Sequence, residues 1–180
     1  SDTAKHFIAG QLKAMKELSA VVAPTVNSYK RLVPGYEAPV YICWAQTNRS
    51  SLIRIPRYSP GREQSTRAEL RCPDPSCNPY LAFAVMLRAG LEGIKQKLEL
   101  PDAVNEDVYG FDPEKREKLS IETLPGSLGE AVEEMKKGSV VRKAFGEETF
   151  RKYTAIKSRE WDRYRIQVTP WEQKEYFAAL

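Results

Sequence analysis

The stretch from residue 66 to residue 98 reads TRAELRCPDPSCNPYLAFAVMLRAGLEGIKQKL and contains a strand signal followed by a helix signal. Because side chains alternate along a strand, Arg67, Glu69 and Arg71 would project from one face of a strand over residues 66–72. The intervening Ala68 and Leu70 would face the other way. A carboxylate between two guanidinium groups stays ionised, so this face is either a salt-bridged sheet surface or part of a functional site.

The helix signal begins shortly after the strand ends. Asn78 is a typical N-cap, Pro79 is a typical first helical residue, and the apolar residues that follow predict a long helix through Leu98. Its apolar composition indicates a largely buried core helix.

Helix and strand signals also occur before residue 66 and after residue 98. Further predicted elements are a helix over residues 3–19, strands over residues 40–45 and 51–55, short helices beginning at Asp112 and Ser127, and a helix over residues 147–168. Residues 23–39, rich in Pro, Gly, Asn and Ser, predict a long loop. The expected fold class is α+β, with a helical majority packed on a small, mainly antiparallel sheet. Three strands leave both sheet edges without partners, which indicates part of a larger catalytic domain.

The composition is that of a folded domain. The 180 residues are 42% hydrophobic and 29% charged, enough for one core and unlike a disordered chain. No apolar run approaches the roughly 20 residues of a membrane-spanning helix, and no signal region opens the chain, so we expect a cytoplasmic protein. Three cysteines and one histidine, His6, match no zinc-site spacing and no disulfide scaffold.

Arginine is concentrated in residues 30–71. This segment holds eight basic and three acidic residues, a net charge of +5, whereas the rest of the chain carries −1. It contains seven of the fourteen arginines and one of the fourteen lysines. Planar guanidinium forks suit bidentate contacts to carboxylate and phosphate, so the segment favours small anionic ligands over nucleic acid, for which mixed lysine and arginine are typical. Arginines on a solvated face are the alternative.

Several motifs resemble those of type I glutamine synthetase. They are NSYKRLVPGYEAP at residues 27–39, NRS at 48–50, IRIP at 53–56, RAELR at 67–71, NPYL at 78–81, LPGSL at 124–128 and VTPWE at 168–172. These motifs run in order along the whole chain. The resemblance implies that residues 1–180 form the C-terminal portion of the glutamine synthetase catalytic domain, without the N-terminal β-grasp domain and the first part of the catalytic domain.

The resemblance also implies an activity and roles for five arginines. In that family ATP phosphorylates the side-chain carboxylate of glutamate, and ammonia then displaces phosphate from γ-glutamyl phosphate to give glutamine. Arg31 would bind the α-carboxylate of glutamate and Arg71 its side-chain carboxylate. Arg49 would be a catalytic residue that contacts glutamate and the transferred phosphate, while Arg54 and Arg67 would contact the nucleotide.

Two acidic residues complete the implied site. Glu69 would be a ligand for one Mg²⁺ or Mn²⁺ ion, since such cations prefer oxygen donors. Glu37, on a loop bracketed by Pro and Gly, would be catalytic: it would help bind ammonium beside the glutamate, take its proton and close the site against water. Tyr109 lies where some members carry an adenylylated tyrosine, but its surroundings match poorly and we assign it no regulatory role.

A lone Glu69 leaves most of a metal's coordination sphere empty, so we expect the isolated chain to be inactive. The family's partners are glutamate, ammonia and ATP, and its full-length members form homo-oligomers of two stacked hexameric rings. One alternative is a relative that ligates glutamate to a polyamine, which the intact PGYEAP at residues 34–39 disfavours. The other is a non-catalytic assembly domain, supported by the apolar tail residues Trp171, Tyr176, Phe177 and Leu180.

Overall fold

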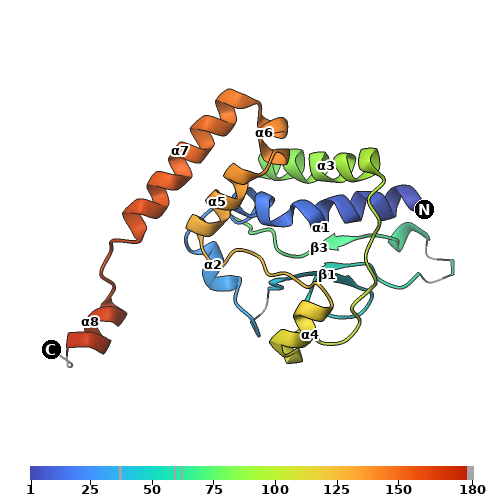
Figure 1. Ribbon diagram of the computed structural model, residues 1–180, viewed down its shortest axis with the longest axis horizontal. Helices are drawn as coiled ribbons and strands as arrows, with labels where there is room; N and C mark the ends of the chain where they lie inside the picture. Colours follow the sequence, from blue (N-terminus) through green and yellow to red (C-terminus); the bar gives the residue numbers. More distant parts are fainter. Residues whose placement is uncertain (37, 59, 62, 178–180) are drawn as a thin grey trace.

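The computed structural model describes residues 1–36, 38–58, 60–61 and 63–177, and it has a helical majority around a small sheet (Figure 1). In chain order the elements, with η for 3-10 helices, are α1 (Asp2–Val22), α2 (Ser28–Arg31), β1 (Tyr41–Ala45), β2 (Ser51–Arg54), η1 (Glu63–Ser65), β3 (Glu69–Leu70), α3 (Pro79–Gln96), η2 (Val108–Gly110), α4 (Pro113–Lys118), α5 (Leu128–Lys137), α6 (Val140–Phe145), α7 (Glu147–Tyr164) and α8 (Pro170–Tyr176). The expected α+β class is confirmed.

The sheet is mixed, whereas we expected it to be mainly antiparallel. Its strand order is β1-β2-β3, with β1 parallel to β2 and β2 antiparallel to β3. Strands this close in sequence usually form an antiparallel hairpin. Here residues 46–50 return the chain from the end of β1 to the level of its start, so that β2 runs in the same direction as β1. Residues 104–108 contact this connection, since the amide of Gln46 donates to the Asn105 side chain over 3.1 Å. This contact with a segment far along the chain accompanies the parallel pairing, and no local sequence pattern predicted it.

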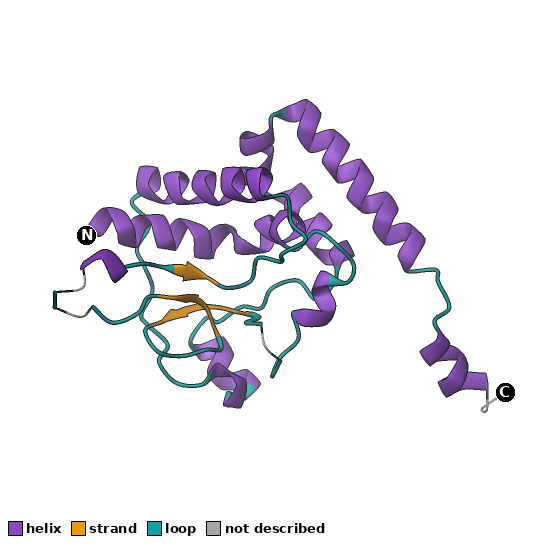
Figure 2. Ribbon diagram, turned by 180° about the vertical axis from the view of Figure 1, so that it is seen from behind, coloured by secondary structure: helices purple, strands orange, loops and turns teal. Residues whose placement is uncertain are grey.

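Helices α1 and α3 lie side by side on one side of the sheet (Figure 2). They approach closely at Gly10 and Gly93, where a Cβ on Gly10 would lie 2.2 Å from the carbonyl oxygen of Ala89. Beneath this crossing the core is formed by fully buried side chains from both helices and the sheet, including Met15, Leu18, Leu52, Ile53 and Val85. The core therefore lies between the helix pair and the strands.

We expected the helix that begins after Asn78, which is α3, to be largely buried, and this is wrong for one of its faces. Tyr80, Phe83, Leu87 and Leu91, which we call the α3 stripe, are 82%, 67%, 54% and 50% exposed. Their spacing of three or four residues puts them on one side of the helix. The described part of the chain covers α3 from the sides of α1 and α6 and leaves this stripe exposed, which the composition of the helix did not reveal.

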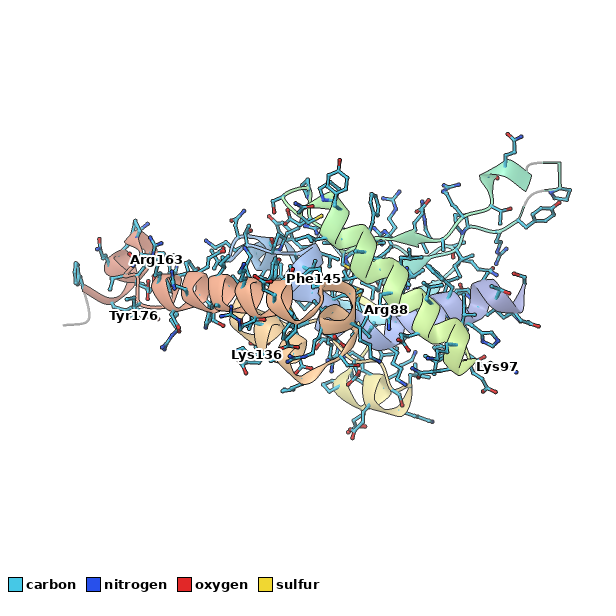
Figure 3. All side chains as sticks on the ribbon, turned by 90° about the horizontal axis from the view of Figure 1, so that it is seen from above. Arg88, Lys97, Lys136, Phe145, Arg163 and Tyr176 are labelled. Carbon is cyan, nitrogen blue, oxygen red and sulfur yellow. The ribbon has the colours of Figure 1, made fainter. Side chains whose placement is uncertain are left out.

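The C-terminal helices form an arm that points away from the body (Figure 1). Of the residues in α7 only Phe150 is buried, and α8 has no buried residue within its described length. Figure 3 shows Phe145 where α6 meets α7, and Arg163 and Tyr176 far out along the arm. Neither α6 nor α8 was predicted.

Local end signals are confirmed where they were predicted. The Asn78 side chain accepts from the amide of Tyr80 over 3.0 Å, and the Ser127 hydroxyl accepts from the amide of Glu130 over 3.1 Å. The predicted loop over residues 23–39 contains the single turn α2. None of the described helices has both the length and the apolar character needed to cross a membrane.

Candidate anion-binding site

Glu69 lies between two arginines, but the strand pattern predicted only one of them: its partners are Arg67 and Arg54, not Arg67 and Arg71. Arg54 at the end of β2 pairs across the sheet with Glu69 on β3, and its guanidinium reaches one carboxylate oxygen at 2.7 Å. Nε of Arg67 donates to the other oxygen over 2.6 Å. Partial burial alone would raise the pKa of Glu69, but the hydrogen bonds from Arg67 and Arg54 outweigh it and hold the pKa below its ordinary value. Glu69 is therefore a carboxylate.

Arg71 belongs to the same cluster but turns toward the backbone. Its guanidinium donates to the carbonyl of Arg49, and to the carbonyl of Ser51 over 3.3 Å. Partial burial lowers the pKa of Arg71, and the neighbouring charges of Arg54 and Arg49 lower it further. Tyr109 and Glu69 act in the opposite direction, and burial is the largest cause of the lowered pKa, to which the arginine charges add.

Arg49 is exposed and lies in a turn over residues 48–50, here called the arginine turn, that is fixed from both sides. Within it, the Asn48 side-chain oxygen accepts from the amide of Ser50 over 2.8 Å and from its hydroxyl over 2.6 Å. The Ser50 hydroxyl, almost fully buried, accepts from the amide of Val108 over 3.0 Å. The sequence indicated Arg49 but not its supports, since their partners lie more than fifty residues away in the chain.

Tyr109 extends this support toward the loop that carries Glu37. Its hydroxyl donates to the backbone carbonyls of Tyr36 over 3.3 Å and Ala38 over 3.4 Å. The ring also packs against Tyr41, with ring centroids 5.8 Å apart. Glu37 itself lies outside the described residues. Sequence reasoning assigned Tyr109 no role, and a tyrosine in a polar loop carries no local signal for such a contact.

Arg31 reaches the cluster only through the backbone. From α2 it donates to the carbonyls of Cys72 over 2.5 Å and Pro73 over 3.2 Å, immediately after Arg71 in the chain. Its Nε is buried and has no hydrogen-bond partner. The structure thus brings Arg54 and Arg67 to Glu69, joins the backbone of Arg49 to Arg71, and anchors Arg31 beside the end of that strand.

The donor set fits a divalent cation only in part. Glu69 is an ionised oxygen donor, the type that Mg²⁺ and Mn²⁺ prefer, but arginines contact both its oxygens. Across residues 1–36, 38–58, 60–61 and 63–177 no three His, Cys, Asp or Glu side chains group closely enough to hold a metal. Burial raises the pKa of Cys72 to about 12, so this free cysteine stays a thiol and adds no ligand. Glu69 is therefore the carboxylate that the described part of the arginine cluster offers to a metal ion.

A carboxylate surrounded by fixed guanidinium groups at a strand end defines a site for small, multiply charged anions. Comparison with known proteins identifies the family of the chain that carries this site. The model of the glutamine synthetase catalytic domain matches residues 1–176. The chain belongs to the glutamine synthetase family, as its motifs indicated.

Relatives cover the chain almost completely. It is 53% identical over 180 residues to the glutamine synthetase of Methanosarcina mazei and 54% identical over 172 residues to that of Thermotoga maritima. It spans 40% and 38% of their lengths. Among solved structures, a GmaS/ADP complex superposes with a TM-score of 0.84 at 34% identity, covering 99% of this chain and 40% of the other. The chain therefore corresponds to about two fifths of such a protein.

Proposed function

We propose that this chain supplies the arginine-rich wall of a glutamine synthetase active site, for the ATP-dependent ligation of ammonia to glutamate through γ-glutamyl phosphate. The observation that carries the proposal is the pairing of Arg54 and Arg67 with Glu69, with Arg71 of the same segment donating to the backbone carbonyl of Arg49 on the arginine turn. Membership of the family suggests which reaction is catalysed, and the arginine cluster supplies the fixed positive charge that this reaction needs. A relative solved with ADP supports a nucleotide as the second ligand.

The arginines act by charge stabilisation. A phosphoryl group in transfer spreads negative charge over its oxygens, and cations already held in place stabilise that charge without reorganising. Arg49, exposed on its fixed turn, would contact glutamate and the transferred phosphate. Arg54 and Arg67 would contact the nucleotide oxygens, and Arg31 and Arg71 the two carboxylates of glutamate.

The acidic residues have separate tasks in this proposal. Glu37, outside the described residues, would take the proton of ammonium and so release the nucleophile. Glu69 would donate one oxygen to a Mg²⁺ or Mn²⁺ ion, whose chemistry is to neutralise charge on the phosphates. Its two arginine partners keep it anionic, but a full coordination sphere needs further oxygens.

We propose that the chain is the C-terminal portion of such a catalytic domain and is inactive alone. The described residues bring no three potential metal ligands together, which supports this, because further ligands for a metal at Glu69 would have to come from elsewhere. The exposed Trp171, Tyr176 and Phe177 on the arm support assembly into a homo-oligomer. Leu180 of that tail lies outside the described residues, and the cytoplasmic location stays a prediction.

The test is a chimera. The stretch of the Methanosarcina mazei relative that aligns with this chain is replaced by this chain, and glutamine formation from ATP, glutamate and ammonium is measured. We expect an active chimera, an inactive isolated chain, and a loss of roughly 100-fold in kcat/KM for Arg49→Ala. Arg151→Ala, an exposed arginine on α7, is the matched control and should change little.

Three outcomes contradict the proposal. A folded but inactive chimera would refute the assignment of the reaction. Equal activity of the Arg49→Ala and Arg151→Ala variants would remove the arginine cluster from the mechanism. Faster turnover with putrescine than with ammonium would support the polyamine alternative, which the names of the relatives do not favour.

A further inference from the structure

The arginine turn and the loop that contains Tyr36 and Ala38 are connected through residues 104–109, which are distant from both in sequence and which we call the bridging segment. At one end it is fastened to the arginine turn, because the Asn48 side chain donates to the carbonyls of Val104 and Glu106. The amide of Val108 donates to the buried Ser50 hydroxyl. These contacts fix the bridging segment against the turn that carries Arg49.

At its other end the bridging segment presents Tyr109 to the backbone carbonyls of Tyr36 and Ala38. One hydroxyl contacts both carbonyls. The Tyr109 ring packs against the ring of Tyr41, with 5.8 Å between the two ring centroids. Ala38 is 1% exposed whereas Tyr36 is 66% exposed, so the hydroxyl acts where the loop leaves the core.

A turn organises the other side of this loop. The amide of Tyr36 donates to the carbonyl of Val33 over 3.3 Å, and Gly35 has a φ of +79°. Pro34 followed by a glycine with positive φ is typical of a type II turn. Tyr36 therefore ends a tight turn and Ala38 is buried, and the Tyr109 hydroxyl contacts the backbone carbonyls of both.

We propose that Tyr109 is a positioning residue that fixes the backbone at Tyr36 and Ala38 relative to the arginine turn. The inference rests on the proposed function, in which Glu37, between these two residues in the chain, takes the ammonium proton. Without the hydroxyl, the backbone at Tyr36 and Ala38 would vary in position and ammonia would compete less well with water. Water would then attack the acyl carbon of γ-glutamyl phosphate, phosphate would leave with the bonding electron pair, and glutamate would be regenerated.

The first experiment measures coupling in the chimera. Wild type should release one phosphate per glutamine, and Tyr109→Phe should release clearly more because part of the intermediate is hydrolysed. The apparent KM for ammonium should rise about three- to tenfold, as expected for the loss of a hydrogen bond between neutral groups, while the KM for ATP stays unchanged. A merely structural loss would lower all rates and leave the phosphate-to-glutamine ratio at one.

The second experiment uses the chain alone and does not depend on activity. Hydrogen exchange of peptides covering residues 33–40 should be faster in Tyr109→Phe and in Ser50→Ala. In the double variant the effects should not add, because both changes break one connection. Tyr80→Phe, at an exposed tyrosine on α3, is the matched control and should exchange like wild type.

The two experiments separate the failures. An inactive wild-type chimera refutes the proposed function, and the exchange experiment still decides whether Tyr109 holds the backbone at Tyr36 and Ala38. An active chimera with a ratio of one and an unchanged ammonium KM in Tyr109→Phe refutes the positioning role. Unchanged exchange in that variant refutes the physical connection itself.

Discussion

At the scale of the residue, two glutamates show how surroundings decide a charge. Arginine hydrogen bonds lower the pKa of Glu69. Glu17 has the opposite shift: burial raises its pKa, although it accepts from the amide of Val141 over 2.7 Å and Lys143 lies near it. Its carboxylate caps α6, whose own N-cap residue Ser139 makes no side-chain cap bond.

The raised pKa of Glu17 predicts a pH dependence of stability. The folded state binds the proton more tightly than the unfolded state, so stability is highest below the ordinary pKa and falls as the pH rises through the raised pKa. Urea unfolding of wild type and Glu17→Gln from acidic to neutral pH should show the wild type losing stability relative to the variant. If the free energy of unfolding of the wild type instead rises with pH relative to that of Glu17→Gln, the cap bonds to the ionised carboxylate outweigh the effect of burial.

At the scale of the element, the crossing of α1 and α3 depends on the absence of side chains. A Cβ on Gly10 would lie 2.8 Å from Cα of Gly93 and closer still to the carbonyl of Ala89, and both contacts are backbone. Gly10→Ala should therefore destabilise the chain by about 2 kcal/mol through overpacking, measured by urea unfolding. Gly126→Ala is the control, because its Cβ would meet only the Glu130 carboxylate, at 3.6 Å. Equal midpoints for the two variants would show that the helices separate at no cost.

The elements also show what the sequence could predict. Helix starts at Asn78 and Ser127 were predictable because a cap involves residues two or three apart. The clustering of Arg67 and Glu69 followed from strand alternation. The parallel pairing of β1 with β2 and the support of the arginine turn were not predictable, because both involve contacts from residues 104–108, far along the chain.

At the scale of the whole molecule, the body and the arm differ in what holds them. The body has one continuous core, from α1 through the sheet to α5. In the arm Phe150 is buried near the start of α7, with the Arg142 guanidinium 4.2 Å from its ring centre. Farther out, Trp171 contacts Tyr176 within α8, and both are largely exposed. Between these two sites Tyr153 donates to the carbonyl of Ala20 over 2.8 Å and Trp161 packs against the core, so the stability of the chain should depend on α7 and not on α8.

Truncation tests this division directly. Removing residues 168–180 should change the free energy of unfolding by less than about 0.5 kcal/mol, as for changes at exposed positions. Phe150→Ala should cost roughly 3 kcal/mol, because it leaves a cavity in the core. Both are measured by urea unfolding at equal chain concentration, since association through the arm would add a concentration-dependent term. A truncated chain that is as unstable as Phe150→Ala at high dilution would mean that α8 packs on the body, whereas a loss seen only at high concentration would locate the arm's contribution between chains.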